Sequence, residues 1–309
     1  MCRRSFPADI RAVPHKASRG RAGPIEGHSL KPSYSKVDQR YNWSASPSYW
    51  PHGKLGRSRP PPADRGNDGD TTEAVLRVTK NETPRDRVLL IAAHPDDPEF
   101  GCAGTMAKWA QQGKIITYLL LTSGDKGSHD PQVTPAQIAG QREEEQMAAA
   151  RELGVSEVVF LRHPDGLLEN NLSLRRQLAG EIRERQPNIV VTIDPWRKYQ
   201  LHPDHRAAGQ AACDAVYAAR EWYIFPEQLV KGRQPWRVRE LYLFWTDSPD
   251  YWEDITDCME HRLAALWHHA SQVRDRTEEI ARRIRENAEA AGVQPGYQYA
   301  EAFKRFELR

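Results

Sequence analysis

The stretch RVLLIAAHPDDPEFGCAGT, residues 87–105, decides the expected fold. It begins with a short apolar run, residues 88–93, of the kind that a parallel strand buried on both faces requires. The run leads into His94 and the adjacent carboxylates Asp96 and Asp97, with a third carboxylate at Glu99. Adjacent carboxylates repel one another, so this end of the strand predicts a site in which a cation offsets their charge.

The same alternation continues along the chain. Apolar, β-branched runs recur at residues 114–122, 157–161, 188–193 and 240–246, and segments of helical composition lie between them at residues 102–112, 137–153 and 173–186. Strands that alternate with helices through short connections are typical of a parallel sheet. The sequence therefore predicts an α/β fold, a Rossmann-like, doubly wound, mostly parallel sheet flanked by helices. Apolar residues three to four apart predict one long helix at residues 256–289.

The N-terminal part of the chain has a different composition. Residues 1–70 carry 13 Lys and Arg against 6 Asp and Glu, and they hold nine of the 22 prolines. Such a segment buries too little apolar surface to offset the entropy of ordering it. We expect residues 1–84 to be a disordered, basic extension and residues 85–309 to be the folded domain. A nucleic-acid-binding arm is the less favoured interpretation, because the basic residues are scattered rather than clustered.

The composition also bears on location. The longest apolar runs, residues 88–93 and 189–193, are far shorter than the roughly 20 residues that span a bilayer. The first residues, MCRRSFPADIRAV, lack the apolar core of a secretory signal. The four cysteines form no CxxC pair, which favours reduced thiols. These features predict a cytoplasmic protein without a membrane span.

Polar residues follow each predicted strand. His94, Asp96 and Asp97 follow the first strand, and Asp165 follows the third. The sequence LHPDH, residues 201–205, comes after the fourth strand. Ligands of open α/β sheets bind outside the carboxyl ends of the strands, so these side chains are expected to converge in space.

The HPDH sequence at residues 202–205 completes a possible metal site. Its proline suits the first position of a helix, and His202 and His205, three residues apart, then project to one side of the first turn. Two histidines and a carboxylate are ligands of the kind found in catalytic zinc sites, which keep one position for water. Of two adjacent carboxylates, one can bind the metal while its neighbour acts as a general base.

Taken together, these motifs resemble the LmbE-like (PIG-L) family of zinc-dependent deacetylases. The resemblance rests on AAHPDDPEFGCAGT, LTSGDKGS, QREEEQMAAARELGV, the PDG at residues 164–166 and HPDHRAAG, in this order. It runs from about residue 86 to the YAEAF near the C-terminus. Family members remove acetyl groups from N-acetylglucosamine-type sugars or cleave related amides, and they include the mycothiol and bacillithiol biosynthetic deacetylases and the mycothiol conjugate amidase.

The resemblance implies a role for each site residue. Zinc ligands are His94, Asp97 and His205, and iron(II) is a possible replacement for zinc. Asp96 becomes the general base, and His202 stabilises the oxyanion or protonates the leaving amine. Asp204 is expected to hold His202 in position and tune its protonation without binding the metal itself. Arg142 and Asp165 match positions that hold the sugar of a small acylated amino-sugar substrate.

Some alternatives stay open at this point. Arg142 could instead be a surface residue of its helix, paired with Glu145 or Gln146. The family usually reads HPDDE, whereas Pro98 here separates Asp97 from Glu99 and leaves the role of Glu99 open. His268 and His269 are expected to be packing or surface residues. The aromatic segment at residues 219–239 is the expected rim of the pocket.

Two rival functions are weighed against the deacetylase. The HPD at residues 94–96 also fits the H-x-D of an iron(II) oxygenase, although those sites usually lie on all-β barrels. A non-catalytic binding protein on the same fold is the other rival. An additional acid and an additional histidine beside a complete set of metal ligands are more than binding requires, which favours an enzyme.

Overall fold

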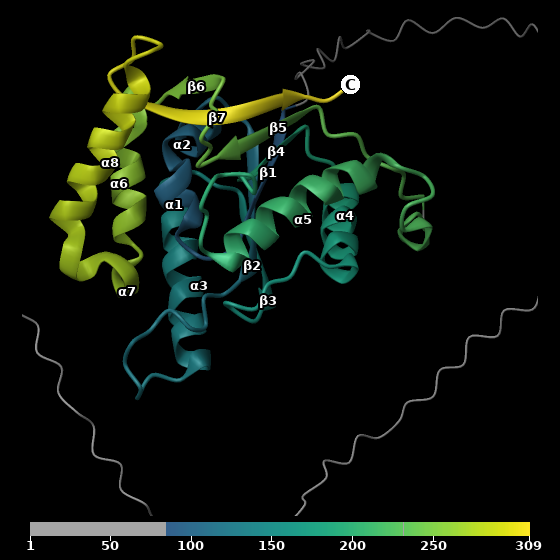
Figure 1. Ribbon diagram of the computed structural model, residues 1–309, viewed down its shortest axis with the longest axis horizontal. Helices are drawn as coiled ribbons and strands as arrows, with labels where there is room; N and C mark the ends of the chain where they lie inside the picture. Colours follow the sequence, from purple (N-terminus) through teal and green to yellow (C-terminus); the bar gives the residue numbers. More distant parts are fainter. Residues whose placement is uncertain (1–84, 231) are drawn as a thin grey trace, which may run out of the picture. The chain divides into compact units, whose positions relative to one another are not determined.

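The described residues, 85–230 and 232–309 of this computed structural model, form a seven-stranded sheet (Figure 1). The extension predicted at residues 1–84 lies outside the described residues. The strands are β1 (Arg87–Ala92), β2 (Ile115–Thr122), β3 (Glu157–His163), β4 (Ile189–Ile193), β5 (Glu240–Phe244), β6 (Tyr251–Asp254) and β7 (Ala300–Glu307), in the spatial order β3-β2-β1-β4-β5-β7-β6. Strands β1 to β5 pair in parallel, and β7 runs antiparallel to both β5 and β6. The predicted doubly wound, mostly parallel fold is confirmed.

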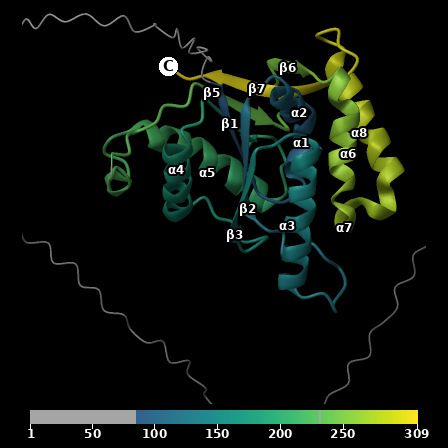
Figure 2. The same cartoon turned by 180° about the vertical axis from the view of Figure 1, so that it is seen from behind.

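Helices cover both faces of this sheet. They are α1 (Asp97–Gly101), α2 (Ala103–Gln111), α3 (Pro135–Glu152), α4 (Leu172–Arg185), α5 (Pro203–Arg220), α6 (Met259–Trp267), α7 (Ala270–Val273) and α8 (Thr277–Gly292), with short 3-10 turns at Pro226–Gln228, Thr256–Cys258 and Arg274–Arg276. Figures 1 and 2 show α4 and α5 on one face and α1, α2 and α3 on the other, with α6 and α8 outside the second group. The central strands are therefore buried on both sides, as their apolar runs predict.

Local signals set the ends of the first helices. Thr134 caps α3 by accepting from the backbone N–H of Gln137, whose side chain bonds back to the backbone of Thr134. Asn171 caps α4 by accepting from the backbone N–H of Leu174. Gly154 follows α3 with a φ of 72°, in the left-handed region that glycine tolerates.

The prediction of one long final helix at residues 256–289 is wrong. The chain forms α6, turns at His268 and His269, and returns as α7 and α8, so that α6 and α8 lie side by side (Figures 1 and 2). At the turn His269 is fully buried and bonds to Glu99. The apolar spacing is the same on both sides of such a turn, which is why periodicity did not reveal it.

The strand order places a crevice beside β1. The chain winds outward from β1 to β2 and β3 in one direction and from β4 to β5 in the other, so the order reverses between β1 and β4. In open α/β sheets the loops that leave the strands at such a switch point separate and form the ligand site. The residues that follow β1 and β4 are the HPDD and HPDH sequences.

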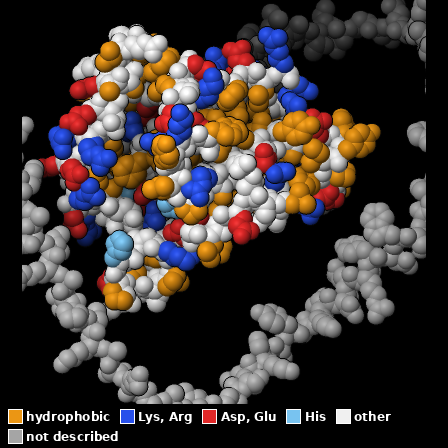
Figure 3. Space-filling model, viewed as in Figure 1, with side chains coloured by type: hydrophobic (Ala, Val, Ile, Leu, Met, Phe, Trp, Pro, Cys, Tyr) orange, Lys and Arg blue, Asp and Glu red, His pale blue; other side chains and the backbone are white. Residues whose placement is uncertain are grey.

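The surface of the described residues has mixed polarity. On the face shown in Figure 3, Lys and Arg side chains lie interspersed with Asp and Glu side chains. Among the helices of residues 85–309 that are described, none is both long enough and apolar enough to cross a membrane.

Candidate active site

A cavity of about 590 Å³ opens at the switch point of the sheet. Seven of the eight predicted site residues line it: His94, Asp96, Asp97, Arg142, Asp165, His202 and His205. The eighth, Asp204, lies directly behind this wall and is fully buried. The convergence expected from the topology is therefore present.

Asp97 is a buried residue that lines the cavity. Its Oδ2 accepts hydrogen bonds from the backbone N–H groups of Ala93 (3.1 Å) and His94 (2.9 Å), which fixes the turn after β1. Its Oδ1 lies 3.0 Å from Nε2 of His205. Burial acts to raise the pKa of Asp97, but His205 and His94 outweigh burial and hold that pKa well below its usual value. Pro98 is compatible with this geometry, because it occupies the first turn of α1, where no backbone donor is required.

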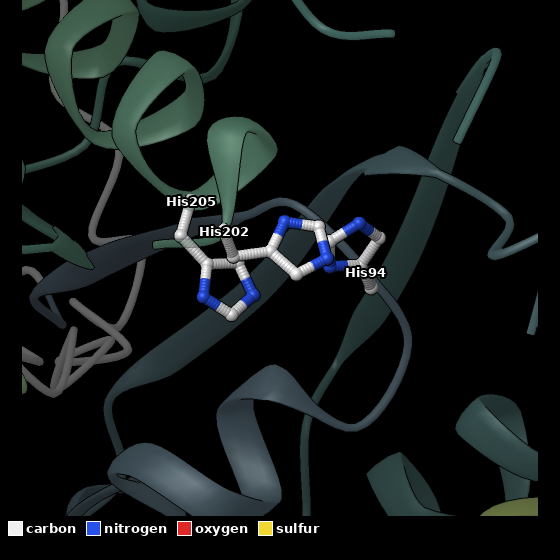
Figure 4. Close-up of side chains that lie close together, drawn as sticks. All are labelled: His94, His202 and His205. Atoms are coloured by element: carbon white, nitrogen blue, oxygen red, sulfur yellow. The ribbon is translucent and has the colours of Figure 1, made fainter. Parts of the chain in front are cut away.

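Three histidine rings, those of His94, His202 and His205, lie close together in the cavity, as Figure 4 shows. His202 and His205 come from the first turn of α5 and stack with ring centroids 4.4 Å apart. The ring of His94 approaches that of His202 edge-on at 4.7 Å. Each of the three offers a ring nitrogen within 4.8 Å of the others, as metal ligands would. Burial lowers the pKa of His202, and the neighbouring rings of His205 and His94 lower it further.

Carboxylates surround His94. Its Nε2 lies 3.1 Å from Oδ1 of Asp165 and 3.1 Å from Oδ2 of Asp204, and its Nδ1 lies 3.5 Å from Oδ2 of Asp97. Burial acts to lower the pKa of His94, but these carboxylates outweigh it and raise the pKa to about 12. Three acids around one imidazole are an excess of negative charge that a cation would offset. His94, Asp165 and Asp204 also present ligand atoms within 4.8 Å of one another, so the site fits a metal ion.

Asp204 does not contact the residue expected. Its carboxylate bonds to His94 and accepts from the backbone N–H groups of Gly166 (2.7 Å) and Leu168 (3.1 Å). The expectation that it holds His202 is wrong, because two residues along a helix do not face each other. Asp204 instead joins the loop after β3 to the turn after β1.

Arg142 is buried in this site and is not a surface residue. Its Nη2 donates to the carbonyl oxygen of Pro95 (2.6 Å) and to Oδ2 of Asp96 (3.2 Å), and its Nη1 donates to the carbonyl oxygen of Gly124 (3.3 Å). A Cβ atom at Gly124 or Gly127 would overlap the guanidinium group, so a side chain at either position would displace Arg142. The alternative pairing with Glu145 or Gln146 is wrong, since Glu145 accepts from Ser271 and Gln146 bonds to Asp96 and Glu99.

Asp96 is the acid of the pair without a histidine contact. It has a φ of 86°, in the region that side-chain-bearing residues rarely adopt, and its carboxylate is held by Arg142. Burial raises the pKa of Asp96 to about 6, although Arg142 opposes the rise. A carboxylate that titrates near neutrality is suited to proton transfer.

The structure adds pocket residues that sequence reasoning missed. Trp245, Gln272 and Asn287 line the cavity, and the Trp245 ring lies 5.3 Å from the ring of His205. Trp245 directly follows β5, so the rule on the carboxyl ends of strands could have found it. Gln272 and Asn287 lie on α7 and α8, and no local signal marks them.

The prediction that residues 219–239 form the rim of the pocket is wrong. None of its described residues lines the cavity. The segment follows the C-terminal end of α5, and a helix of 18 residues separates it by roughly 27 Å from the histidines at the other end. Arg183, which is almost fully buried, ties this segment down by donating to backbone oxygens of Ala218, Ala219, Glu221, Ile224 and Phe225.

Comparison with known proteins bears on both the fold and the site. Residues 89–216 match the PIG-L family, described as GlcNAc-PI de-N-acetylase. The chain is 35% identical over 219 residues to a diacetylchitobiose deacetylase of Thermococcus kodakarensis, covering 71% of this chain and 82% of that one. The solved structures that are similar include the following two. One is N,N'-diacetylchitobiose deacetylase from Pyrococcus horikoshii (TM-score 0.68, 31% identity, 72% and 85% of the two chains). The other is GalB, the 4-carboxy-2-hydroxymuconate hydratase from Pseudomonas putida (TM-score 0.63, 25% identity, 72% and 97%). On this evidence of sequence, fold and site together, the chain belongs to the PIG-L family.

Proposed function

We propose that this protein is a metal-dependent hydrolase that removes the acetyl group from an N-acetylglucosamine-type substrate or a related amide. The observation that carries the proposal is the pair of adjacent acids in one cavity. Asp97 contacts His205, whereas Asp96 is left free of the histidines and titrates near neutrality. The similar proteins named as deacetylases of an acetylated disaccharide support the same reaction class.

The metal of this proposal is zinc, held by His94, Asp97 and His205. The short contact between Asp97 and His205 and the buried carboxylates around His94 support a cation in this place. A zinc ion bound there would polarise a carbonyl group and lower the pKa of a water molecule to about 7. Iron(II) accepts the same nitrogen and oxygen ligands, so it is the alternative ion.

The remaining residues either take part in proton transfer and hydrogen bonding during the reaction or bind the substrate. Asp96 takes the proton of the attacking water, and Arg142 keeps the Asp96 carboxylate oriented toward the cavity. Because the pKa of His202 is lowered, its ring is neutral near pH 7 and suits donation of an N–H to the developing oxyanion. Asp165 and Arg142 lie on the cavity wall, where they can bond to sugar hydroxyl groups.

Three other reactions are weighed against this assignment. The similarity to a hydratase means that the fold alone does not specify an amide substrate. The mycothiol-conjugate type of amidase would use the same cavity on a different acyl group. An iron(II) oxygenase is disfavoured, because the site lies on a parallel α/β sheet rather than on an all-β barrel.

Amine release is the measurement that tests the proposal. The zinc-loaded protein is incubated with N-acetylglucosamine, diacetylchitobiose and thiol-bearing N-acetylglucosaminyl conjugates, and free amine and acetate are quantified. We expect equal amounts of both products from at least one substrate. Asp96→Asn, which keeps the size of the side chain, should lower kcat by about 10²–10⁴-fold while metal content is unchanged. Release of no amine from any of these substrates, with hydration of an unsaturated acid instead, would refute it.

A further inference from the structure

A buried chain of hydrogen bonds leads away from the backbone of Asp96. The Asp96 N–H donates to Oε1 of Gln146 (3.0 Å), and Nε2 of Gln146 donates to Oε1 of Glu99 (2.9 Å). The other carboxylate oxygen of Glu99 lies 3.2 Å from Nε2 of His269. Gln146, Glu99 and His269 each have no exposed surface. The three come from α3, α1 and the turn between α6 and α7, so these hydrogen bonds join two helices to that turn.

The direction of each bond is fixed by the next one. A carboxylate only accepts, so Glu99 requires an N–H from Gln146 on one side and an N–H from His269 on the other. Once the amide nitrogen of Gln146 faces Glu99, its oxygen faces Asp96 and accepts the backbone N–H. The orientation of the Gln146 amide is therefore set by Glu99 and not by Asp96 alone.

The end of this chain lies where the backbone is strained. Asp96 has a φ of 86° and a ψ of −23°, and a residue held in such a region costs of order 1–3 kcal/mol. The bond from its N–H to Gln146 is one of the contacts that keep the backbone there, and Arg142 holds the side chain independently. Neither Gln146, Glu99 nor His269 lines the cavity, so none can touch a substrate there.

We propose that His269, Glu99 and Gln146 are positioning residues that hold Asp96 in its strained conformation and so direct its carboxylate into the cavity. This inference rests on the proposed role of Asp96 as general base. It assigns a role to Glu99, which Pro98 had left open. It also explains why His269 is turned inward at the break between α6 and α7.

The test combines amide exchange with kinetics. Gln146→Met keeps the length of the side chain and removes both hydrogen bonds. In the metal-free protein we expect hydrogen exchange of the Asp96 amide to accelerate at least about tenfold. In the zinc-loaded protein we expect kcat to fall about 10- to 100-fold, because a misplacement of 1 Å can cost about 10²-fold, with KM within about threefold. Glu99→Gln keeps the acceptor for Gln146 but places an N–H against the N–H of the His269 ring, so it should lower kcat, though by less than Gln146→Met does.

Glu253→Gln is the matched control. Glu253 is also buried and hydrogen-bonded, but its partners are Trp109, Tyr251 and Lys108, none of which bonds to Asp96, Gln146, Glu99 or His269. It should change thermal stability without changing exchange at Asp96 or kcat. The inference is overturned if Gln146→Met keeps the wild-type rate of Asp96 amide exchange and the wild-type kcat. It is also overturned if Gln146→Met loses thermal stability while its kcat is unchanged. An inactive wild-type protein would instead contradict the proposed function, since exchange at Asp96 is measured without metal or substrate.

Discussion

Replacing Arg142 by Met should cause a loss of activity that depends on pH. The guanidinium lies 3.2 Å from the Asp96 carboxylate. Burial raises the pKa of Asp96 and Arg142 opposes the rise, so that the pKa is about 6 with both effects present. Two unit charges at this distance interact by about 1.3 kcal/mol even at the dielectric constant of water. Removing the cation therefore makes protonation of Asp96 at least about tenfold more favourable, and a lower effective dielectric would enlarge the effect.

The sign and size of the effect follow from Asp96 acting as a base. In the wild type kcat/KM should fall below about pH 6, as Asp96 takes up a proton. In Arg142→Met the deprotonated fraction falls by at least about twofold at pH 7 and about fivefold at pH 6, and it is unchanged near pH 9. The ratio of kcat/KM between the two proteins should follow these values across pH. The buried carbonyl oxygen of Pro95 also loses its donor, which should lower the free energy of unfolding by about 1–3 kcal/mol, whereas the carbonyl oxygen of Gly124 still accepts from the N–H of Gly127.

The assay is a pH series of kcat/KM for the zinc-loaded proteins, with Arg151→Met as the control. Arg151 lies on the same helix but is exposed, so its replacement should leave the profile unchanged. A loss in Arg142→Met that is the same at pH 6 and pH 9 would refute the coupling to Asp96. Arg142 would then act only by holding the substrate.

The other predictions concern the metal, the oxyanion, the packing of α5 and the N-terminal extension. His205→Ala should reduce bound zinc well below one equivalent by elemental analysis, and full metal content in this variant would contradict the ligand assignment. His202→Ala should lower kcat by about 10²–10³-fold with metal retained and the limb above pH 7 unchanged, whereas loss of that limb would identify His202 as the general acid. Gly209→Ala should destabilise the fold by about 1–3 kcal/mol, because a Cβ atom at this position would overlap the carbonyl oxygen of Ile193. Gly140→Ala should instead raise the melting temperature, because a Cβ atom there lies in open space on α3. A chain that begins at Thr83 should fold and turn over substrate at close to the full-length rate, and loss of its cooperative melting transition would show that the extension is part of the fold.

Short-range signals in the sequence were sufficient for much of the sheet. The apolar runs of β1 to β5 and the helices between them follow from composition, although the caps Thr134 and Asn171 begin α3 and α4 slightly before the predicted residues 137 and 173. Strands β6 and β7 were not predicted, because their pairing depends on residues far away in the chain. Residue Phe303 of β7, for example, pairs with Phe244 of β5.

The site was predictable where its members are close in sequence or follow a strand. HPDD and HPDH each bring their polar residues together within one turn of chain, and the carboxyl ends of β1 and β4 then bring the two sequences together. The hydrogen-bond partners of the site residues were less predictable than their positions. Asp204 was expected in the site, yet the direction in which its side chain points depends on the first turn of α5 packing against the loop after β3.

The sequence by itself determined the order of strands β1 to β5 and of the helices between them, the family resemblance and the two clusters of histidine and aspartate, because each depends on neighbours a few residues apart. Only the tertiary structure decided that Arg142 is buried against Asp96, that α6 ends at an inward-facing His269, and that Glu99 bonds to Gln146 across 47 residues of sequence and to His269 across 170. The reason is physical. A buried charge is stable only when its partners and the exclusion of water come from several elements at once, and no single segment of the chain carries that information.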